Sequence, residues 1–577
     1  MIFDRVKPLE AILATAEKKS LHRSLGAFDL TMLGIGAIIG TGIFVLTAVA
    51  ANKAGPGMMY SFVIAGVVCA LTALIYSEIA AMVPVSGSAY TYTYAVMGEL
   101  LAWMVGWALI LEYGVAASAV AVGWSGYANG WLHAIGVGLP AAFSAGPLDP
   151  MMIPDSALFL DEVARTLPQG VQSLSEGVVK FADGSAFPMT GAIEVPNRIG
   201  SITLPLPTKV DLEGAVVMAD GAIRLADGRL MNSDLSFKGG TFNLIAFLLS
   251  LLVAGLLVLG TSKSAKFTAV LVIVKIVALV AFIALAFPAV KASNFEPMLP
   301  NGWGTPMGGI GVLGAAASIF FAYVGFDAVS TAAEETKNPN RNIPIGLIAS
   351  LAVCTVIYLL VSYSAVGAIG AQPGGPLSNS PEPLAFVLRQ LGHEQIGNWV
   401  AIAAIIALPS VVLMMIFGQT RILFTMARDG LLPESLSKVH SKFQTPYVIT
   451  WVVGIAVAIF SALFPVGVLA DISNSGTLFA FFMVAVGVLI LRRTQPNRKR
   501  PFKTPFVWVV GPLAAAGCLL LFFSLGTYTL SVFLIWATLG LLVYFVYSRS
   551  RSHVGRGLTE VHEDDAGIPP PPVPPIS

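Results

Sequence analysis

Charged residues are scarce in this sequence: Asp, Glu, Lys and Arg together make up 11 % of its 577 residues. Apolar residues make up 56 %, and the mean hydropathy is +0.80, which is far above that of soluble domains. The formal net charge is +1, so there is no basic excess of the kind that binds nucleic acid. The composition predicts an all-α polytopic membrane protein in a lipid bilayer, with no nucleic-acid partner.

Cysteine and histidine are scarce as well. The three cysteines, Cys69, Cys354 and Cys518, all lie in apolar runs, so we expect neither a disulfide framework nor a metal site. No histidine lies deep in an apolar run, which argues against a histidine proton relay and against a hydrolase. The first 26 residues are polar and basic, and they lack the apolar core of a cleavable signal. We therefore expect no enzyme activity, no catalytic residues and no cofactor.

The apolar runs predict twelve membrane-spanning helices, and an even number places both termini on one side. Lys and Arg are frequent in the short loops on that side, whereas the short loops on the other side hold only Lys53, Lys291 and Arg389. The positive-inside rule then predicts that both termini are cytoplasmic. The expected spans are 27–49, 58–83, 97–131, 241–260, 266–288, 309–333, 343–370, 396–420, 446–464, 469–491, 506–526 and 529–548.

A long insert, 132–239, interrupts the spans and is expected to be external. Ala-Asp-Gly occurs three times in it, and Asp-Gly favours tight turns, so we expect short β-hairpins such as Val216–Leu225. An amphipathic helix is expected around Asp155–Leu167. The predicted organisation is a cytoplasmic N-terminus (1–26), spans 1–3 (27–131), the insert (132–239), spans 4–12 (240–548) and a proline-rich, disordered cytoplasmic tail (549–577).

Four glycines in nine residues, from Gly34 to Gly42, mark the first span. Glycine in a helix interior costs roughly 0.5–1 kcal/mol relative to alanine, so this cluster favours an opened helix. An opened backbone in a membrane is tolerated where protein, water or a bound solute satisfies its polar groups, which suggests a solute site near the bilayer midplane. The alternative is close helix packing, because Gly36 and Gly40 form a GxxxG pair.

Ionisable residues deep in a span indicate function, and four qualify: Glu78, Glu112, Lys275 and Asp327. Lys275 lies nine residues into its span, roughly 13–14 Å deep. Its ammonium group needs the free carbonyls of an interrupted helix, a carboxylate such as Glu112 or Asp327 in a static ion pair, or a depressed pKa. Glu112 could bind a cationic side chain, carry a proton or pair structurally. Glu78 lies near the cytoplasmic end of its span, which suits a hydrated gate or packing.

The sixth span contains a second candidate break, where Gly325 precedes the buried Asp327. The first and sixth spans correspond if spans 1–5 and 6–10 form two inverted repeats of five helices. Interrupted helices in corresponding places are the best sequence pointer to a transport site.

Three motifs carry a family resemblance. Leu33–Phe44 resembles the first helix of the amino acid–polyamine–organocation superfamily. Phe320–Ala328, continuing into Ala332–Pro339, is similar to the sixth helix of its cationic amino acid transporter family. Gly418–Arg421 and Ala427–Pro433 resemble that family's segment after the eighth helix. The resemblance covers about 27–131 and 240–548, and the insert departs from compact members of the family.

The resemblance implies a 5+5 inverted-repeat core with broken helices 1 and 6, two further helices, and amino acid transport by alternating access. It implies that Ile38, Gly40, Thr41 and Gly42 bind substrate, with the last three providing amides for the carboxylate. The carbonyls of Phe321, Ala322 and Val324 would bind the substrate ammonium group. Lys275 would occupy the place of a sodium ion in sodium-coupled relatives, and Glu112 would lie near the substrate side chain.

We therefore predict a multi-pass secondary amino acid transporter of the plasma (inner) membrane, coupled to protons and independent of sodium. Its partners would be an amino acid, protons and the bilayer, with Lys275 as coupling residue and Glu78 and Asp327 as gating residues. The alternatives are an amino acid exchanger, or a channel or sensor that uses the external insert. A channel would need a continuous polar pore, which four scattered charges do not line.

Overall fold

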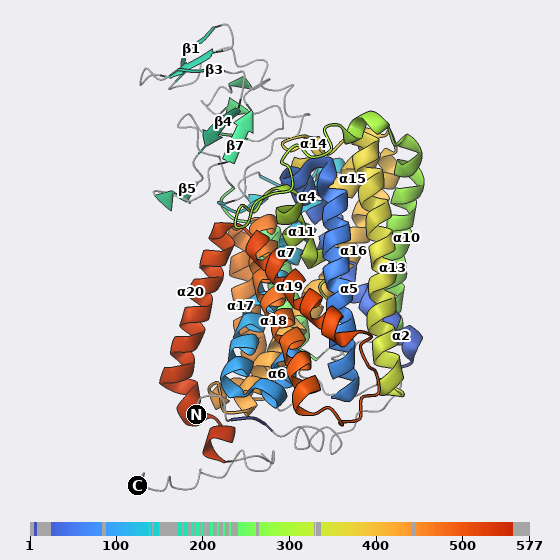
Figure 1. Cartoon of the computed structure of the whole chain (residues 1–577). Helices are drawn as coiled ribbons and strands as arrows, with labels where there is room; N and C mark the ends of the chain where they lie inside the picture. The colour runs from blue at the N-terminus through green and yellow to red at the C-terminus, as the bar shows by residue number, and fades with distance from the viewer. Residues whose placement is uncertain are drawn as a thin grey trace.

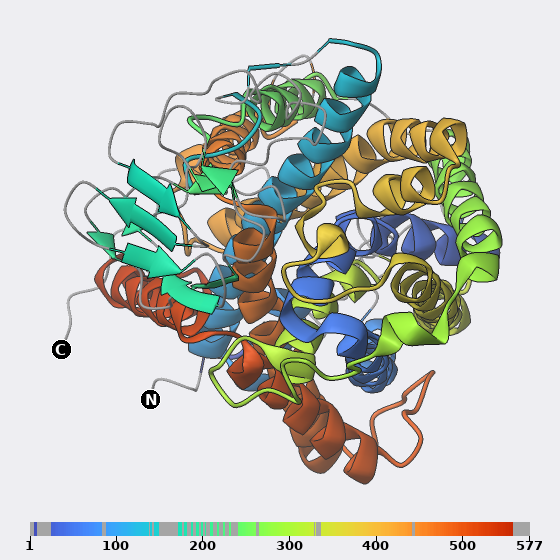
Figure 2. The same ribbon diagram turned by 90° about the horizontal axis from the view of Figure 1, so that it is seen from above.

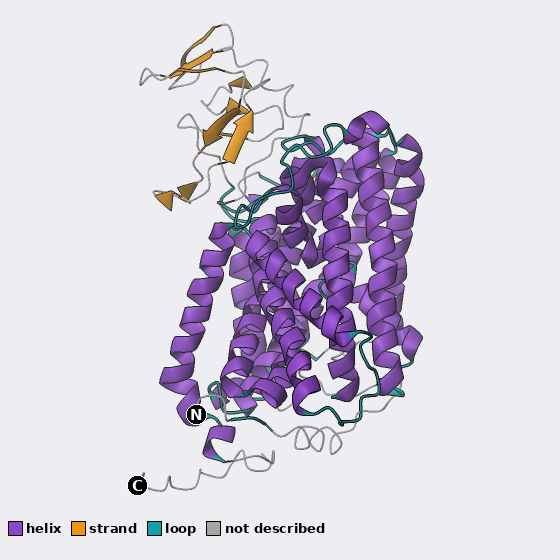
Figure 3. Ribbon diagram, in the orientation of Figure 1, coloured by secondary structure: helices purple, strands orange, loops and turns teal. Residues whose placement is uncertain are grey.

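Helices dominate the computed structural model, and most of them run side by side in one bundle (Figures 1 and 3). The structure describes residues 5–7, 25–83, 88–137, 139–140, 143–148, 240–260, 265–327, 329, 336–440, 443 and 445–557, with short strands between 171 and 231. The expected helix at 155–167 and the tail beyond 557 lie outside the described residues.

The long helices follow the apolar runs of the sequence, and short helices lie between them. The α-helices of the described part are α2 (Ala27–Ile38), α3 (Thr41–Phe44), α4 (Leu46–Ala54), α5 (Met58–Met82), α6 (Ser88–Met97), α7 (Glu99–Ala134), α9 (Leu244–Val258), α10 (Ala265–Ala286), α11 (Gly311–Tyr323), α13 (Pro339–Ile369), α14 (Pro376–Asn379), α15 (Pro383–Gln390), α16 (Glu394–Arg428), α17 (Tyr447–Leu463), α18 (Val466–Thr494), α19 (Val507–Ser524), α20 (Thr527–Val543) and α21 (Arg549–Arg551).

Eight helical segments among the described residues are long and apolar enough to cross a membrane, and α2, α9, α11 and α17 are shorter apolar helices. The chain is therefore an integral, polytopic membrane protein. That twelve helices cross the membrane stays a prediction. The third expected run, 97–131, corresponds to α7, which continues to Ala134 and so ends inside the segment assigned to the insert.

The core of the bundle surrounds α7. In its most apolar window of 18 residues 78 % of the residues are buried, against 22 % for the corresponding window within Thr527–Arg551 at the edge of the bundle. Figure 2 shows α7 crossing the middle of the bundle and α20 at its margin. Because α7 packs against both α16 and α18, its polar side chains face protein rather than lipid.

Short antiparallel strands lie at one end of the bundle, opposite the end where α20 finishes (Figure 1). β1 (Val171–Ser175), β2 (Val178–Phe181) and β3 (Ala186–Pro188) form one sheet, and β4 (Ala192–Val195) pairs with β7 (Thr208–Asp211). In the expected hairpin at 216–225, Val216 pairs with Arg224 and Val217 with Ile223, while the residues between the strands lie outside the described part. The remaining strands are β5 (Arg198–Ile199), β6 (Ile202–Thr203), β8 (Val216–Val217), β9 (Ile223–Arg224) and β10 (Leu230–Met231).

The two ends of the described chain meet at the other end of the bundle, at the buried carboxylate of Glu99 in the first turn of α7. Arg5 forms an ion pair with it at 3.2 Å, the Tyr94 and Tyr544 hydroxyls donate to it at 3.0 and 2.9 Å, and Ser552 donates as well. The predicted tail begins at 549, and the structure describes its first residues, 549–557, which include α21. They are held because Ser552 satisfies a buried charge, a contact that composition does not reveal.

Candidate functional site

The first apolar run is interrupted at residues 39 and 40, inside the glycine cluster. α2 ends at Ile38, Ile39 and Gly40 are extended, and helix resumes at Thr41. The break leaves the last carbonyls of α2 without partners in a continuing helix, and three of them accept hydrogen bonds from other groups. Ile35 accepts from the Ile39 amide at 2.8 Å, Gly36 accepts from Lys275, and Ile38 accepts from the Tyr358 hydroxyl at 2.9 Å.

Lys275 lies on α10 and is buried, with 1 % of its surface exposed. Its Nζ donates to the carbonyl oxygen of Gly36 at 2.9 Å. The sequence left two partners open, and the structure has the carbonyl; no ion pair joins Lys275 to Glu112 or Asp327 among the described residues. Glycine at 36 makes the approach possible, because a Cβ there would lie 2.6 Å from Val272 one turn away on α10.

On the other side of the break, helix resumes with amides that have no helical acceptor. The Thr41 hydroxyl beside them is buried and has no hydrogen-bond partner among the described residues. A Cβ at Gly42 would lie 2.2 Å from the Cα of Ala322, so α3 and α11 touch through a position that only glycine can occupy. The predicted substrate residues of the first and sixth helices are therefore neighbours.

The sixth expected span also opens. α11 ends at Tyr323, Val324 is extended, and Gly325 has a φ of +118°, a conformation that disfavours other residues. The carbonyl of Phe321 accepts from the Val324 amide at 3.2 Å, so one of the three predicted carbonyls is already engaged. No backbone amide donates to the carbonyls of Ala322 and Val324 among the described residues.

Glu112 and Tyr113 of α7 lie beside these breaks. The Tyr113 hydroxyl donates to the Asp327 carboxylate at 3.0 Å, which joins the third helix to the opened part of the sixth. Both carboxylate oxygens of Glu112 are buried and have no hydrogen-bond partner among the described residues. A buried carboxylate without a partner is costly, so this position is available to a proton or to a donor on a ligand.

The sequence reasoning missed a polar stretch in α18, from Asp471 to Thr477. The Asn474 amide donates to the carbonyls of Ala317 and Ser318 at 2.7 and 2.9 Å, and Ser473 donates to the Glu112 carbonyl at 3.1 Å. The signal was present, since six of these seven residues are polar or glycine within an apolar run. Asp471 was overlooked because it stood close to the expected start of its span.

An ion pair joins three helices at the strand-bearing end of this site. Lys53 of α4 lies 2.6 Å from Asp471 of α18 and 2.6 Å from the Ser318 hydroxyl of α11, and Ser318 also donates to Asp471. Ser318 precedes Ala322 by four residues, which is about 6 Å along the helix axis. The charged contact therefore lies just beyond the opened backbone of the sixth helix.

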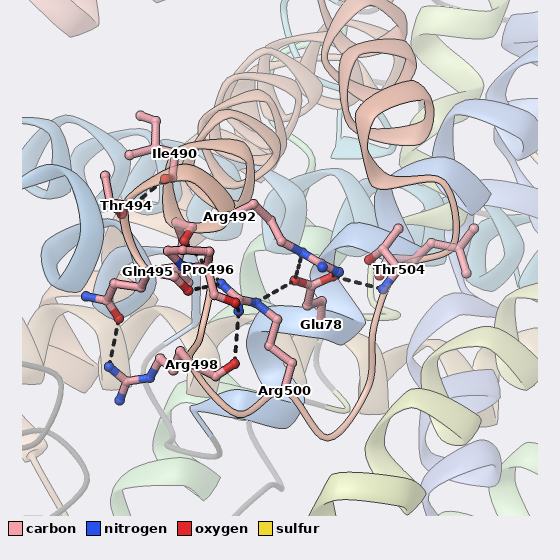
Figure 4. Close-up of polar contacts among 11 residues, drawn as sticks. Glu78, Ile490, Arg492, Thr494, Gln495, Pro496, Arg498, Arg500 and Thr504 are labelled. Atoms are coloured by element: carbon pink, nitrogen blue, oxygen red, sulfur yellow. Dashed lines mark hydrogen bonds and ion pairs between the residues drawn. The ribbon is translucent and has the colours of Figure 1, made fainter.

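Glu78, predicted to be a gating residue, is held by a second charged cluster at the opposite end (Figure 4). Its carboxylate binds the Arg492 guanidinium through two contacts of 2.7 Å and lies 3.2 Å from Arg500. It also accepts from the Thr504 amide at 2.9 Å. This cluster, Glu78 with Arg492, Arg500 and Thr504, ties α5 to the end of α18 and to the loop before α19.

The fold and the site thus define a polytopic membrane protein in which two interrupted helices meet around unpaired polar groups, with charged contacts at both ends. The family model described as "Amino acid permease" matches residues 25–546. The chain belongs to the amino acid permease family, whose members are transporters and not enzymes.

Individual relatives agree with this membership. The chain is 41 % identical over 555 residues to the branched-chain amino acid permease BcaP of Bacillus subtilis, covering 96 % of this chain and 99 % of the relative. It is 38 % identical over 549 residues to the methylthioribose transporter of the same organism, covering 95 % and 98 %. It is 30 % identical over 479 residues to cationic amino acid transporter 4 of Arabidopsis thaliana, covering 83 % and 64 %.

Proposed function

We propose that this protein is a secondary active amino acid transporter that works by alternating access, coupled to protons and independent of sodium. The observation that carries the proposal is the Lys275 ammonium group at the opened end of the first helix, 2.9 Å from the Gly36 carbonyl. A cation is fixed there by the protein itself, so the interrupted helix needs no metal ion at this position. Twelve spans in a 5+5 inverted repeat, residing in the plasma membrane with both termini cytoplasmic, complete the proposal.

The substrate's two backbone groups would bind at the two breaks. The free amides at Gly40, Thr41 and Gly42, with the Thr41 hydroxyl, suit a carboxylate. The carbonyls of Ala322 and Val324 suit an ammonium group. Ile38 would serve the site through its position at the break, because its carbonyl already accepts from Tyr358.

The substrate side chain would be bound near Glu112, and this contact would determine which amino acid is preferred. If Glu112 is protonated, the site suits a neutral, branched side chain, as the name of the Bacillus subtilis permease BcaP suggests for that relative. If it is ionised, its unpaired oxygens favour a cationic side chain. The similarity to BcaP over nearly the whole chain favours the neutral amino acid, and the cationic one is the second candidate.

Alternating access would use the two charged contacts. We propose that the Lys53–Asp471 pair closes the external side and that the Glu78 cluster holds the cytoplasmic side, with Asp327 linking the sixth helix to α7. Each pair joins one helix of the α4–α5 segment to α18. Opening either side then requires α18 to separate from that segment at one end only.

The test is uptake of labelled amino acids by purified protein in proteoliposomes, with and without a pH gradient and with sodium replaced by choline. We expect accumulation driven by an inward proton gradient and unchanged by sodium removal. Uptake that requires preloaded amino acid would identify an exchanger, and flux that only follows the substrate gradient would identify a channel. A protein that moves no amino acid would support the sensor alternative.

Sidedness needs its own measurement. A single cysteine at Ser185, in a background without Cys69, Cys354 and Cys518, should react with an impermeant thiol reagent on intact cells. A single cysteine at Gln495 should react only after permeabilisation. The reverse pattern would overturn the proposed orientation and the external location of 132–239.

A further inference from the structure

A groove of about 460 Å³ lies outside the transport site, between the first turns of α13 and the loop that leads from α18 to α19. Figure 1 shows this loop passing close to the N-terminal end of α13. The groove is lined by Asn340, Arg341, Pro344, Ile345, Ile348, Ala349, Ala352, Pro501 and Phe502. It is apolar along its length and carries one charge, that of Arg341, at the end of α13.

The walls of the groove are fixed by the rest of the structure. On the loop side, the Arg500 guanidinium donates to the carbonyls of Leu491 and Gln495 at 3.1 and 2.8 Å, and Thr504 donates its amide to Glu78 (Figure 4). On the helix side, the Tyr358 hydroxyl of α13 donates a hydrogen bond to the carbonyl of Ile38, which ties α13 to α2. The groove is therefore a built feature between two anchored elements.

Positive charge surrounds its mouth. Arg341 is exposed, and its guanidinium has no hydrogen-bond or ion-pair partner among the described residues. Lys337, Lys499 and Lys503 belong to the two segments that form the groove, and their side chains likewise have no hydrogen-bond or ion-pair partner among the described residues. Neither segment, 336–345 or 495–506, contains an acidic residue. The described residues of these two segments therefore carry positive charge and no negative charge.

The apolar floor continues into the lipid-facing surface of α13. Ile345, Val353, Val356 and Leu360 are exposed at helical spacing along this helix. Beyond the loop, Phe506 is 84 % exposed and Trp508 is also exposed. Exposed aromatic residues of this kind are typical of a membrane–water interface. A chain that enters the groove from its charged mouth would therefore run along α13 into the hydrocarbon.

We propose that this groove is a binding site for an anionic phospholipid, with the headgroup phosphate at Arg341 and one acyl chain along α13. A guanidinium group binds phosphate through charge-assisted hydrogen bonds, and each basic residue near an anionic surface contributes about 1 kcal/mol, or roughly a fivefold change in affinity. A zwitterionic lipid would fill the apolar floor but would gain little from the excess positive charge. The bound lipid would bridge α13 and the loop after α18.

The experiment counts retained lipids on the full-length protein by native mass spectrometry. Purified protein in detergent is titrated with dioleoylphosphatidylglycerol or dioleoylphosphatidylcholine, and its unfolding temperature is followed in parallel. Two variants address the site: Arg341→Gln removes the charge, and Ala349→Trp fills the floor. Two matched controls lie outside the groove: Arg421→Gln removes an exposed cation stacked on Phe417 of α16, and Val452→Trp enlarges an exposed position of α17.

We expect the parent and both controls to retain phosphatidylglycerol in preference to phosphatidylcholine. Arg341→Gln should bind it about fivefold more weakly, and Ala349→Trp should lose the retained lipid. Each variant is compared with its own unfolding temperature without added lipid, so that a general loss of stability is separated from lost binding. Equal retention of both lipids, parent-like retention by both site variants, or equal stabilisation by inorganic phosphate would each overturn the proposal.

Discussion

The ion pair between Lys53 and Asp471 should control how often the strand-bearing end of the site opens. Asp471→Asn removes the charge and leaves an amide of nearly the same shape beside Ser318. The two charged side chains are 18 % and 12 % exposed, so the pair lies between a surface and a buried ion pair. Surface pairs contribute about 0–1 kcal/mol, and breaking a buried pair costs about 3–5 kcal/mol. We therefore expect a loss of about 2 kcal/mol, a roughly 30-fold change in the closed-to-open ratio.

The assay is hydrogen–deuterium exchange of the protein in lipid nanodiscs, read on the peptides that cover α4 and the first turns of α18. Amides that exchange through opening should exchange roughly 30-fold faster in Asp471→Asn. A Lys53→Gln, Asp471→Asn double variant should show little further change, since the pair is already broken by either substitution.

Glu382→Gln is the matched control. It removes an ion pair to Arg389, which lies in the same segment seven residues away and does not join α4 to α18. In this variant we expect faster amide exchange near α15 and an unchanged exchange rate at α4. Unchanged exchange of α4 in Asp471→Asn, or the same change in both variants, would refute the reasoning.

Three further predictions address coupling, specificity and the C-terminal segment. Lys275→Gln keeps a donor for the Gly36 carbonyl but removes the charge. Accumulation driven by a pH gradient in proteoliposomes should therefore be lost, while substrate affinity changes less than about tenfold, 1.4 kcal/mol. A sodium requirement of the parent protein would contradict this mechanism. If lysine or arginine is transported, Glu112→Gln should weaken its binding at least tenfold, roughly 1.4 kcal/mol, and affect alanine less; equal losses would assign Glu112 to coupling or structure. Burial lowers the pKa of His553 below its usual 6.5, in surroundings that contain Asp429, Glu434, Arg556 and Lys7. The stability that the neutral imidazole contributes is complete above pH 6.5 and is lost as the pH falls below 6.5. Tryptic cleavage at Arg556 should therefore become faster below pH 6.5. His553→Gln should remove this pH dependence of the cleavage rate.

Helix positions could be predicted because apolar runs end at glycine, proline and charged residues. The second run was expected at 58–83 and α5 spans Met58–Met82; the ninth was expected at 446–464 and α17 spans Tyr447–Leu463. The break in the first helix was also predictable, since the glycine cluster marks it locally. The start of α18 was misplaced by three residues, because the polar stretch at 471–477 lowers the hydropathy of its first turns.

The partners of the buried charges could not be predicted in the same way. Lys53 and Asp471 are 418 residues apart, and Glu78 and Arg492 are 414 residues apart. Hydropathy is a local property, whereas these contacts depend on how distant helices pack. Lys275 was identified as needing a partner, but sequence reasoning could not choose between a carbonyl and a carboxylate.

The meeting of both chain ends at Glu99 has a consequence for biogenesis. Glu99 is synthesised early, but two of its partners, Tyr544 and Ser552, are among the last described residues to leave the ribosome. Until then the Glu99 carboxylate, which is buried in the finished protein, lacks two of its four partners, and the start of α7 stays incompletely docked. A chain truncated before Ser552 would keep that defect permanently, so Glu99 makes completion of the polypeptide a condition for finishing the end of the bundle where the two termini meet. Fusion partners appended directly after Ser548 should therefore lower the yield of folded protein, whereas fusions placed beyond Gly557 should not.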